Sequence, residues 1–209
     1  MAPLRQVHLE EVVSVLAQRL DSLQIDYAIM GGAAVCLIAS TPERATQDVD
    51  MVVHVDHQSI TADKLTEKLI TTFPGDFQQI LQLGHPIPGY KLNLPPMVFD
   101  QASWPQRRQY NLKKASRLTR VVKGRPVKFF SAEWIMREKI LSRYQRQGFK
   151  SQIDLQDVVN LLRYARPGLP ELDFDSDQEL QAALTSLLEE MPALRSRLSG
   201  TIKCKVVFG

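Results

Sequence analysis

The spacing of apolar residues predicts the secondary structure of the N-terminal part of the chain. Helical spacing marks residues 9–23, and Tyr27–Met30 is a short apolar strand that leads directly into Gly31-Gly32. Small residues then continue as a helix over 33–39. Between 48 and 55 polar and apolar residues alternate, as they do in a strand with one buried face, and helical spacing returns over 60–71.

The remainder of the chain is expected to change from strands to helices near residue 130. Strands are expected at 77–81, 90–94, 97–100, 118–122 and 127–130, and the turn signal at 123–126 joins the last two as a hairpin. Helices are expected at 131–147, 151–165, 176–190 and 191–198, and a final short strand at 202–208. Ser131 is placed to cap the first of these helices. This pattern predicts an α/β core at 1–130 followed by a helical region at 131–209.

Composition indicates an ordinary globular protein with a mild excess of positive charge. The 209 residues are 44% hydrophobic and 23% charged, with a formal net charge of +3. This charge tolerates an anionic partner such as a nucleoside triphosphate or RNA without demanding one. The two cysteines suggest neither a zinc site nor a disulfide framework, and no signal peptide or membrane-length apolar run occurs. We therefore expect an intracellular, cytoplasmic protein without a membrane partner.

A run of basic residues between 107 and 128 has two interpretations. It is either a solvated surface or a positive rim that meets phosphates or an RNA end. Its members are Arg107, Arg108, Lys113, Lys114, Arg117, Arg120, Lys123, Arg125 and Lys128.

The clearest chemical signal lies between Gly31-Gly32 and the pair Asp48 and Asp50. Two carboxylates at positions i and i+2 of a strand share one face, with Cβ atoms roughly 6–7 Å apart. This spacing suits shared coordination of hard divalent cations, and like charges this close are costly unless a cation neutralises them. Two glycines between a strand and a helix let backbone amides approach a phosphate near the anion-favouring end of the helix.

These motifs resemble a known superfamily. Gly31-Gly32 followed by Asp48-Val49-Asp50 on an apolar strand resembles the signature of the DNA polymerase β-like nucleotidyltransferases. The spacing Arg44-x-Thr46-x-Asp48-x-Asp50 is similar to that of the AbiEii toxin-like branch. The stretch from Phe129 to Val158, which includes Lys139, resembles the second conserved stretch of that branch. The resemblance covers about residues 25–165 of the chain.

The resemblance implies an α+β fold with a mixed β-sheet flanked by helices. It also implies transfer of a nucleoside monophosphate from an NTP such as ATP to a hydroxyl of an RNA end, a protein or a small molecule. Mg²⁺ or Mn²⁺ would be the cofactor. The implied site residues are Asp48 and Asp50 as catalytic metal ligands, Gly31 and Gly32 in the phosphate loop, Arg44 and Thr46 beside the nucleotide, and Lys139 on the triphosphate.

The position of a third carboxylate is where the chain departs from the superfamily pattern. Asp100, at the end of an apolar strand, is the preferred catalytic residue and metal ligand, whereas Asn93 is the alternative occupant of this position. With Asn93 the domain would lack a group for general-base activation. The alternative function is then a catalytically degenerate nucleotide-binding or scaffold domain, and a third hypothesis is a toxin neutralised by an antitoxin.

Overall fold

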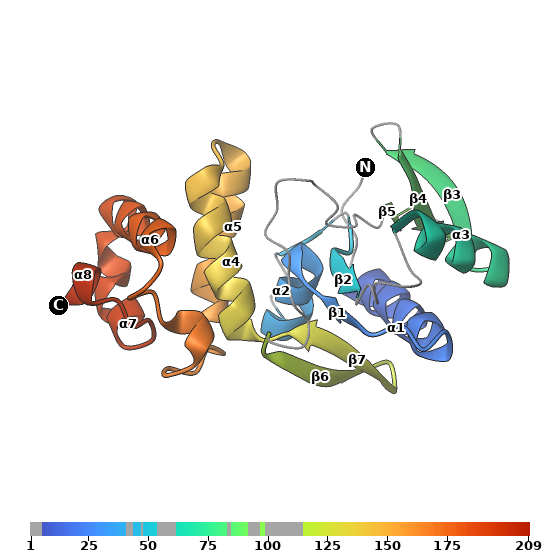
Figure 1. Ribbon diagram of the computed structural model, residues 1–209, viewed down its shortest axis with the longest axis horizontal. Coiled ribbons are helices and arrows are strands. Elements are labelled where there is room, and N and C mark those ends of the chain that lie inside the picture. Colours follow the sequence, from blue (N-terminus) through green and yellow to red (C-terminus); the bar gives the residue numbers. More distant parts are fainter. Residues whose placement is uncertain are drawn as a thin grey trace. The chain divides into compact units, whose positions relative to one another are not determined.

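The computed structural model describes residues 6–40, 44–46, 48–53, 62–82, 85–91, 97–98 and 115–209. It divides into two compact units (Figure 1). Unit 1 contains Met1–Leu37 and Pro42–Phe130, and unit 2 contains Ile38–Thr41 and Ser131–Gly209. None of the described helices has the length and apolar character needed to cross a membrane.

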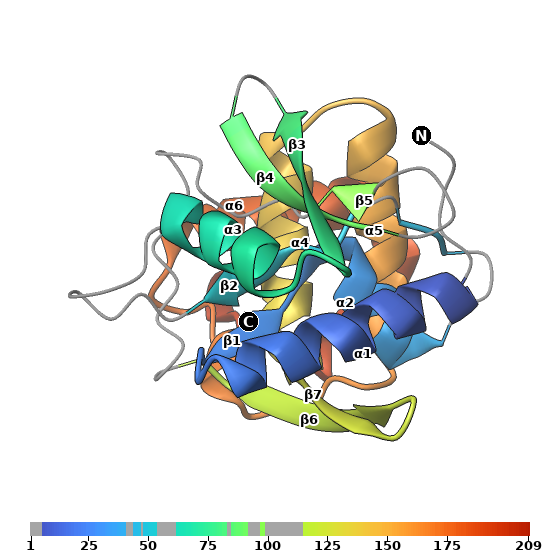
Figure 2. The same cartoon turned by 90° about the vertical axis from the view of Figure 1, so that its right-hand side faces the viewer.

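Unit 1 is built on a four-stranded mixed sheet. Its strands, in the order β2-β1-β7-β6, are β2 (Met51–Val53), β1 (Tyr27–Ile29), β7 (Arg125–Phe130) and β6 (Arg117–Val122). Strand β1 pairs antiparallel with β2 and parallel with β7, and β7 pairs antiparallel with β6. Helix α1 (Gln6–Ser22) packs against β7 (Figure 2). The expected fold class, α+β with a mixed sheet flanked by helices, is confirmed.

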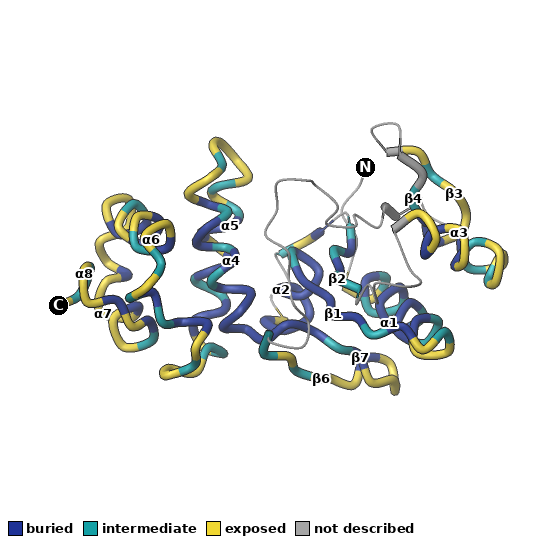
Figure 3. The backbone as a smooth tube through the Cα atoms, viewed as in Figure 1, coloured by how far each residue is buried: buried dark blue, intermediate teal, exposed yellow. Residues whose placement is uncertain are grey.

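The core of unit 1 follows the apolar pattern of the sequence (Figure 3). All three residues of β1 are buried, and α1 buries the residues that its helical spacing places on one side. Helix α2 (Gly31–Ala39) begins directly at Gly31, two residues earlier than expected. Nearly every residue of α2 is buried, and its small residues Ala33 and Ala34 allow close packing on all sides.

A second, antiparallel sheet in unit 1 has the order β3-β4-β5 and contacts α3 (Ala62–Thr72). Its strands are β3 (Phe77–Gln82), β4 (His85–Tyr90) and β5 (Met97–Val98). Strand β4 ends at Tyr90, the first residue of the strand expected at 90–94, and residues 92–94 lie outside the described residues. The sequence does not predict β4, because this strand contains Pro86 and Pro88 and proline is unusual inside a sheet. Strand β5 pairs with β4 only at Gly89 and Tyr90. Among the described strands, the part of β4 that contains both prolines therefore pairs with β3 alone.

Unit 2 is helical. Helix α4 (Ala132–Gln145) packs against α5 (Phe149–Leu161) and α6 (Gln178–Glu190). Ser131 accepts a hydrogen bond from the Trp134 amide at 3.2 Å, which confirms it as the N-cap of α4. The carbonyl of Ala39, the last residue of α2, accepts hydrogen bonds from Arg163 at 3.0 Å and Tyr164 at 3.1 Å. These bonds lie within unit 2, to which Ala39 belongs.

The C-terminal end of the chain differs from the expectation. A strand at 202–208 is wrong: Lys203 makes a single parallel bridge with Asp173, and the chain then turns into helix α8 (Lys205–Phe208). The alternation buries Ile202 and Cys204 but stops at Val206, which is 76% exposed. The helix expected at 191–198 is divided into a 3-10 turn at Pro192–Leu194 and helix α7 (Arg195–Ser199). A further 3-10 turn, at Pro170–Leu172, precedes α6.

Candidate functional site

The turn between β1 and α2 holds the backbone of Gly31 against Asp50. Gly31 has φ +64°, in the left-handed region that favours glycine. A Cβ on Gly31 would lie 1.9 Å from Oδ2 of Asp50 and 2.8 Å from its Cγ. The Met30 amide donates to the Asp50 carbonyl at 2.9 Å, and this bond continues the pairing of β1 with β2. Only a residue without a side chain leaves room for the Asp50 carboxylate at the start of α2.

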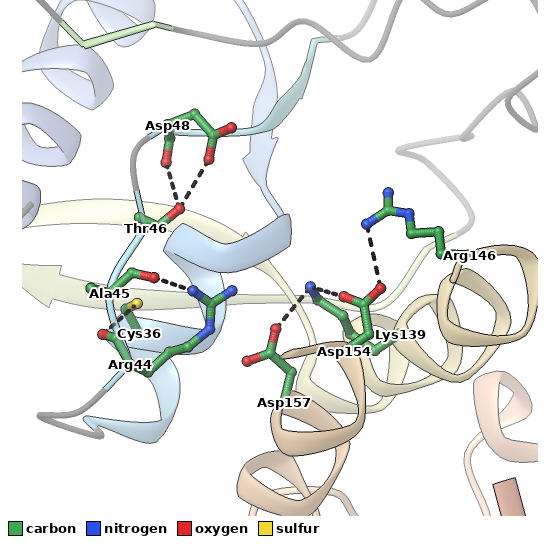
Figure 4. A network of polar contacts seen from close by, with 9 residues as sticks. All are labelled: Cys36, Arg44, Ala45, Thr46, Asp48, Lys139, Arg146, Asp154 and Asp157. Carbon is green, nitrogen blue, oxygen red and sulfur yellow. Dashed lines mark hydrogen bonds and ion pairs between the residues drawn. The ribbon is translucent and has the colours of Figure 1, made fainter. Parts of the chain in front are cut away.

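Gly32 is equally close to two side chains of the segment that precedes β2. A Cβ on Gly32 would lie 2.7 Å from Nη2 of Arg44 and 2.8 Å from Oγ1 of Thr46. Thr46 is buried and donates from its hydroxyl to Oδ1 of Asp48 at 2.9 Å (Figure 4). The two glycines, the arginine, the threonine and the two aspartates therefore gather at the N-terminus of one helix.

Arg44 is fixed by main-chain contacts on both sides. Its carbonyl accepts from the Cys36 thiol at 3.1 Å, and its guanidinium donates to the Ala45 carbonyl. The side chain is half-buried. A guanidinium held beside a helix N-terminus adds positive charge at the place where backbone N–H groups already favour anions.

Asp48 and Asp50 lie just before β2 rather than within it. The expected alternation is nevertheless present, because Val49 and Met51 are 0% and 2% exposed while both aspartates are half-buried. The apolar side chains anchor the segment in the core, and the carboxylates keep access to solvent. This arrangement leaves both carboxylates able to meet a ligand.

The donor set fits a hard divalent cation. Asp48 and Asp50 supply carboxylate oxygens, which Mg²⁺ prefers, and Mg²⁺ usually keeps waters or phosphates as its other ligands. Within the described ranges no group of three or more His, Cys, Asp or Glu side chains comes together to hold a metal ion. Asp100 and Asn93, the two candidates for the third position, lie outside the described residues.

Lys139 belongs to a different cluster, which lies within unit 2. Its ammonium contacts Oδ1 of Asp154 at 2.6 Å and Oδ2 of Asp157 at 2.8 Å, and the lysine side chain is 12% exposed (Figure 4). Both aspartates are buried, and Arg146 contacts the second oxygen of Asp154 at 3.3 Å. Lys139 thus has two anionic partners, and its role as a triphosphate contact stays a prediction.

The sequence pattern alone does not indicate this cluster. Asp154 lies in the first turn of the helix expected at 151–165, where acidic residues favour a helix N-terminus, but α5 begins at Phe149 and its first turn contains no acidic residue. The one available signal was their spacing: two acids three residues apart share a face of a helix, where they need a cation if that face is buried.

The described members of the basic run are partly engaged within unit 1. Asp26 pairs with Arg117 at 2.8 Å and with Lys128 at 3.6 Å. Arg120 donates to the Leu37 carbonyl at 2.6 Å. These three cations therefore stabilise the fold, which weakens the interpretation of the run as one continuous rim for phosphates.

Comparison with solved structures finds a similar protein over the whole chain. An antigenic nucleotidyltransferase-like protein from Paracoccidioides brasiliensis is 53% identical, covers 99% of each chain and superposes with a TM-score of 0.92. No protein-family model matches the chain, and no curated protein matches it.

Two other solved structures are much less similar. The lincosamide antibiotic adenylyltransferase LnuA with lincomycin bound is 15% identical over 73% of this chain and 95% of its own, with a TM-score of 0.47. ANT(2")-Ia in complex with adenylyl-2"-tobramycin is 12% identical over 88% of this chain and 99% of its own, with a TM-score of 0.49. Likenesses this weak assign neither a fold nor an activity.

Proposed function

Since this chain belongs to the nucleotidyltransferase-like protein family, we propose that it transfers a nucleoside monophosphate from an NTP to a hydroxyl acceptor. The observation that carries the proposal is the packing of Asp50 against Gly31. It leaves a carboxylate 1.9 Å from where a Cβ would be, directly at the N-terminus of α2. An anion-favouring helix end beside half-buried carboxylates is the arrangement that a metal-bridged triphosphate requires.

In this proposal each residue of the site has a separate task. Asp48 and Asp50 hold Mg²⁺ or Mn²⁺, which when bound supplies charge neutralisation for the triphosphate and its leaving group. Thr46 holds the Asp48 carboxylate in one orientation through its 2.9 Å hydrogen bond. The backbone amides at the start of α2 and the Arg44 guanidinium orient the phosphates. Catalysis would then rest on positioning and electrostatics rather than on a covalent intermediate.

We further infer that the chain belongs to the AbiEii-type branch. The spacing Arg44-x-Thr46-x-Asp48-x-Asp50 supports this narrower assignment. We also propose that Asp100 is the third metal ligand. The acceptor hydroxyl belongs to an RNA end, a protein or a small molecule.

The test uses the full chain with each labelled NTP, Mg²⁺ or Mn²⁺, and pooled RNA, protein and small-molecule acceptors. Asp48→Asn and Asp50→Asn should each reduce transfer at least about a hundredfold, as loss of a transition-state electrostatic contact does. The matched control is Asp63→Asn, in the exposed first turn of α3, which should leave transfer unchanged. Chelation of the metal should abolish transfer.

Two outcomes would change the conclusion. Full transfer by Asp48→Asn and Asp50→Asn together would show that the site has been assigned to the wrong residues. Thermal stabilisation by an NTP without transfer to any acceptor would favour the degenerate nucleotide-binding domain, in which the fold is kept and the chemistry is lost.

A further inference from the structure

The end of α4 and the start of α5, in unit 2, present two aromatic side chains to solvent. Phe149 is 80% exposed, more than any other large hydrophobic residue of the described chain, and Tyr144 is 46% exposed. Between Tyr144 and Lys150 every residue except Arg146 is exposed (Figure 3). In the part of the chain that the structure describes, neither ring stacks on another ring or on a cation. The fold of unit 2 therefore does not account for either ring.

Three basic residues lie close to these rings in the sequence, and two of them, Arg143 and Arg146, pair with carboxylates. From 141 to 153 the chain contains Arg143, Arg146 and Lys150, and it contains neither Asp nor Glu. Lys150 is exposed and has no ion pair among the described residues. The Arg146 side chain is 37% exposed, although it shares Asp154 with Lys139.

The turn is held in place by hydrogen bonds to α6. Gln145 donates to Glu179 at 2.6 Å, and Gln152 donates to Glu190 at 2.9 Å. Arg143 also pairs with Glu190. The two α6 carboxylates close to this turn, those of Glu179 and Glu190, therefore both have polar partners in it. The exposed rings and cations stand on a fixed support, which reduces the entropy lost when a ligand binds.

We propose that the turn at 144–150 binds single-stranded nucleic acid. Bases stack on Tyr144 and Phe149, and phosphates meet Lys150 and Arg146, which is how strands are bound with little sequence preference. The bound strand would be the acceptor of nucleotidyl transfer, and this part of the inference rests on the proposed function. Binding by the turn itself requires neither NTP nor metal.

Fluorescence anisotropy of a labelled oligouridine and of the matching oligothymidine tests the proposal with the full chain, in the absence of NTP and metal. Tyr144→Ala and Phe149→Ala should each weaken binding about tenfold, the usual effect of losing one base–aromatic stack. Lys150→Ala should weaken binding and also reduce its salt dependence. Equal binding of both strands indicates recognition of stacked bases and phosphates alone, and tighter binding of the RNA indicates an additional contact to the 2′-hydroxyl.

Matched substitutions elsewhere separate this surface from general effects. Val206→Ala removes another exposed apolar side chain, and Lys68→Ala removes another exposed cation. Both should bind as the unchanged chain does. The proposal is overturned if the chain binds neither strand at low salt or if the turn variants bind as tightly as these controls. It is also overturned if the turn variants alter only self-association.

Asp50→Asn keeps a failure of this proposal distinct from a failure of the proposed function. This variant should bind the strand normally while losing transfer. Transfer to nucleic acid that persists in Phe149→Ala with unchanged strand affinity would leave the transferase assignment intact and remove the turn from it.

Discussion

Replacing Gly31 with alanine tests the close approach on which the proposed site depends. The backbone of Gly31 has φ +64°, and an added Cβ would lie 1.9 Å from Oδ2 of Asp50. The left-handed conformation costs an L-residue about 1–2 kcal/mol. Overpacking of a close contact adds about 1–3 kcal/mol. The total is a loss of about 2–5 kcal/mol, a large part of the stability of an ordinary domain.

Gly124→Ala isolates the contribution of the contact. Gly124 has φ +76°, similar to Gly31, but a Cβ there would meet nothing within 4 Å. It should therefore cost only the conformational strain, about 1–2 kcal/mol. The difference in unfolding free energy between the two variants measures the clash with Asp50.

Chemical denaturation measures that difference in unfolding free energy. NTP binding with Mg²⁺ shows whether the Asp50 carboxylate is displaced by the added methyl group. If Asp50 holds its place, Gly31→Ala loses stability relative to Gly124→Ala. If the carboxylate swings away instead, stability is largely kept but metal-dependent NTP binding falls. Equal stability of the two variants together with unchanged NTP binding would refute the contact between Gly31 and Asp50.

Three further changes test other parts of the structure. Thr46→Val removes the hydroxyl that orients Asp48, and it should cost about 1–2 kcal/mol in denaturation and weaken metal-dependent NTP binding; unchanged NTP binding would contradict the positioning role. Lys139→Met removes the cation that two buried aspartates share, although Arg146 still contacts Asp154, and should cost about 3–5 kcal/mol. Replacing both aspartates with asparagine should largely reverse this loss. Burial, together with nearby carboxylates, raises the pKa of Tyr27 from 10.0 to about 12. Because the folded state favours the neutral phenol, its contribution to stability is complete below pH 10 and is lost as the pH rises towards 12. An absorbance titration should show a tyrosine transition near pH 12 that Tyr27→Phe removes.

The sequence predicted the elements whose residues carry a local pattern. The strand ending at Met30, the helix after the glycines and the hairpin before Ser131 follow from periodicity and turn residues. The β4 strand did not, because Pro86 and Pro88 read as loop and its pairing with β3 is a property of the sheet. The strand expected at the C-terminal end was wrong because the β-like run near Val206 has no partner strand among the described residues and forms a helix instead.

Among the site residues, the motif identified which side chains to expect but not how they are held. Nothing in the sequence between Gly31 and Asp50 indicates that a carboxylate packs on the glycine itself, because that contact depends on the pairing of β1 with β2. The partners of Lys139 are equally non-local. They come from α5, 15 and 18 residues further along the chain.

The glycine pair consequently has a second role beside the one expected of it. Small residues at a strand-to-helix turn were expected to admit a phosphate, yet both positions already admit groups of the chain itself, the Asp50 carboxylate at Gly31 and the Arg44 guanidinium at Gly32. A triphosphate that approaches the amides of α2 would meet the negative charge of Asp50, and two anions at one helix end repel unless a cation lies between them. In the proposed function, the geometry that favours anions at this turn should therefore make triphosphate binding depend on a divalent metal, while Arg44 should supply the part of the attraction that does not.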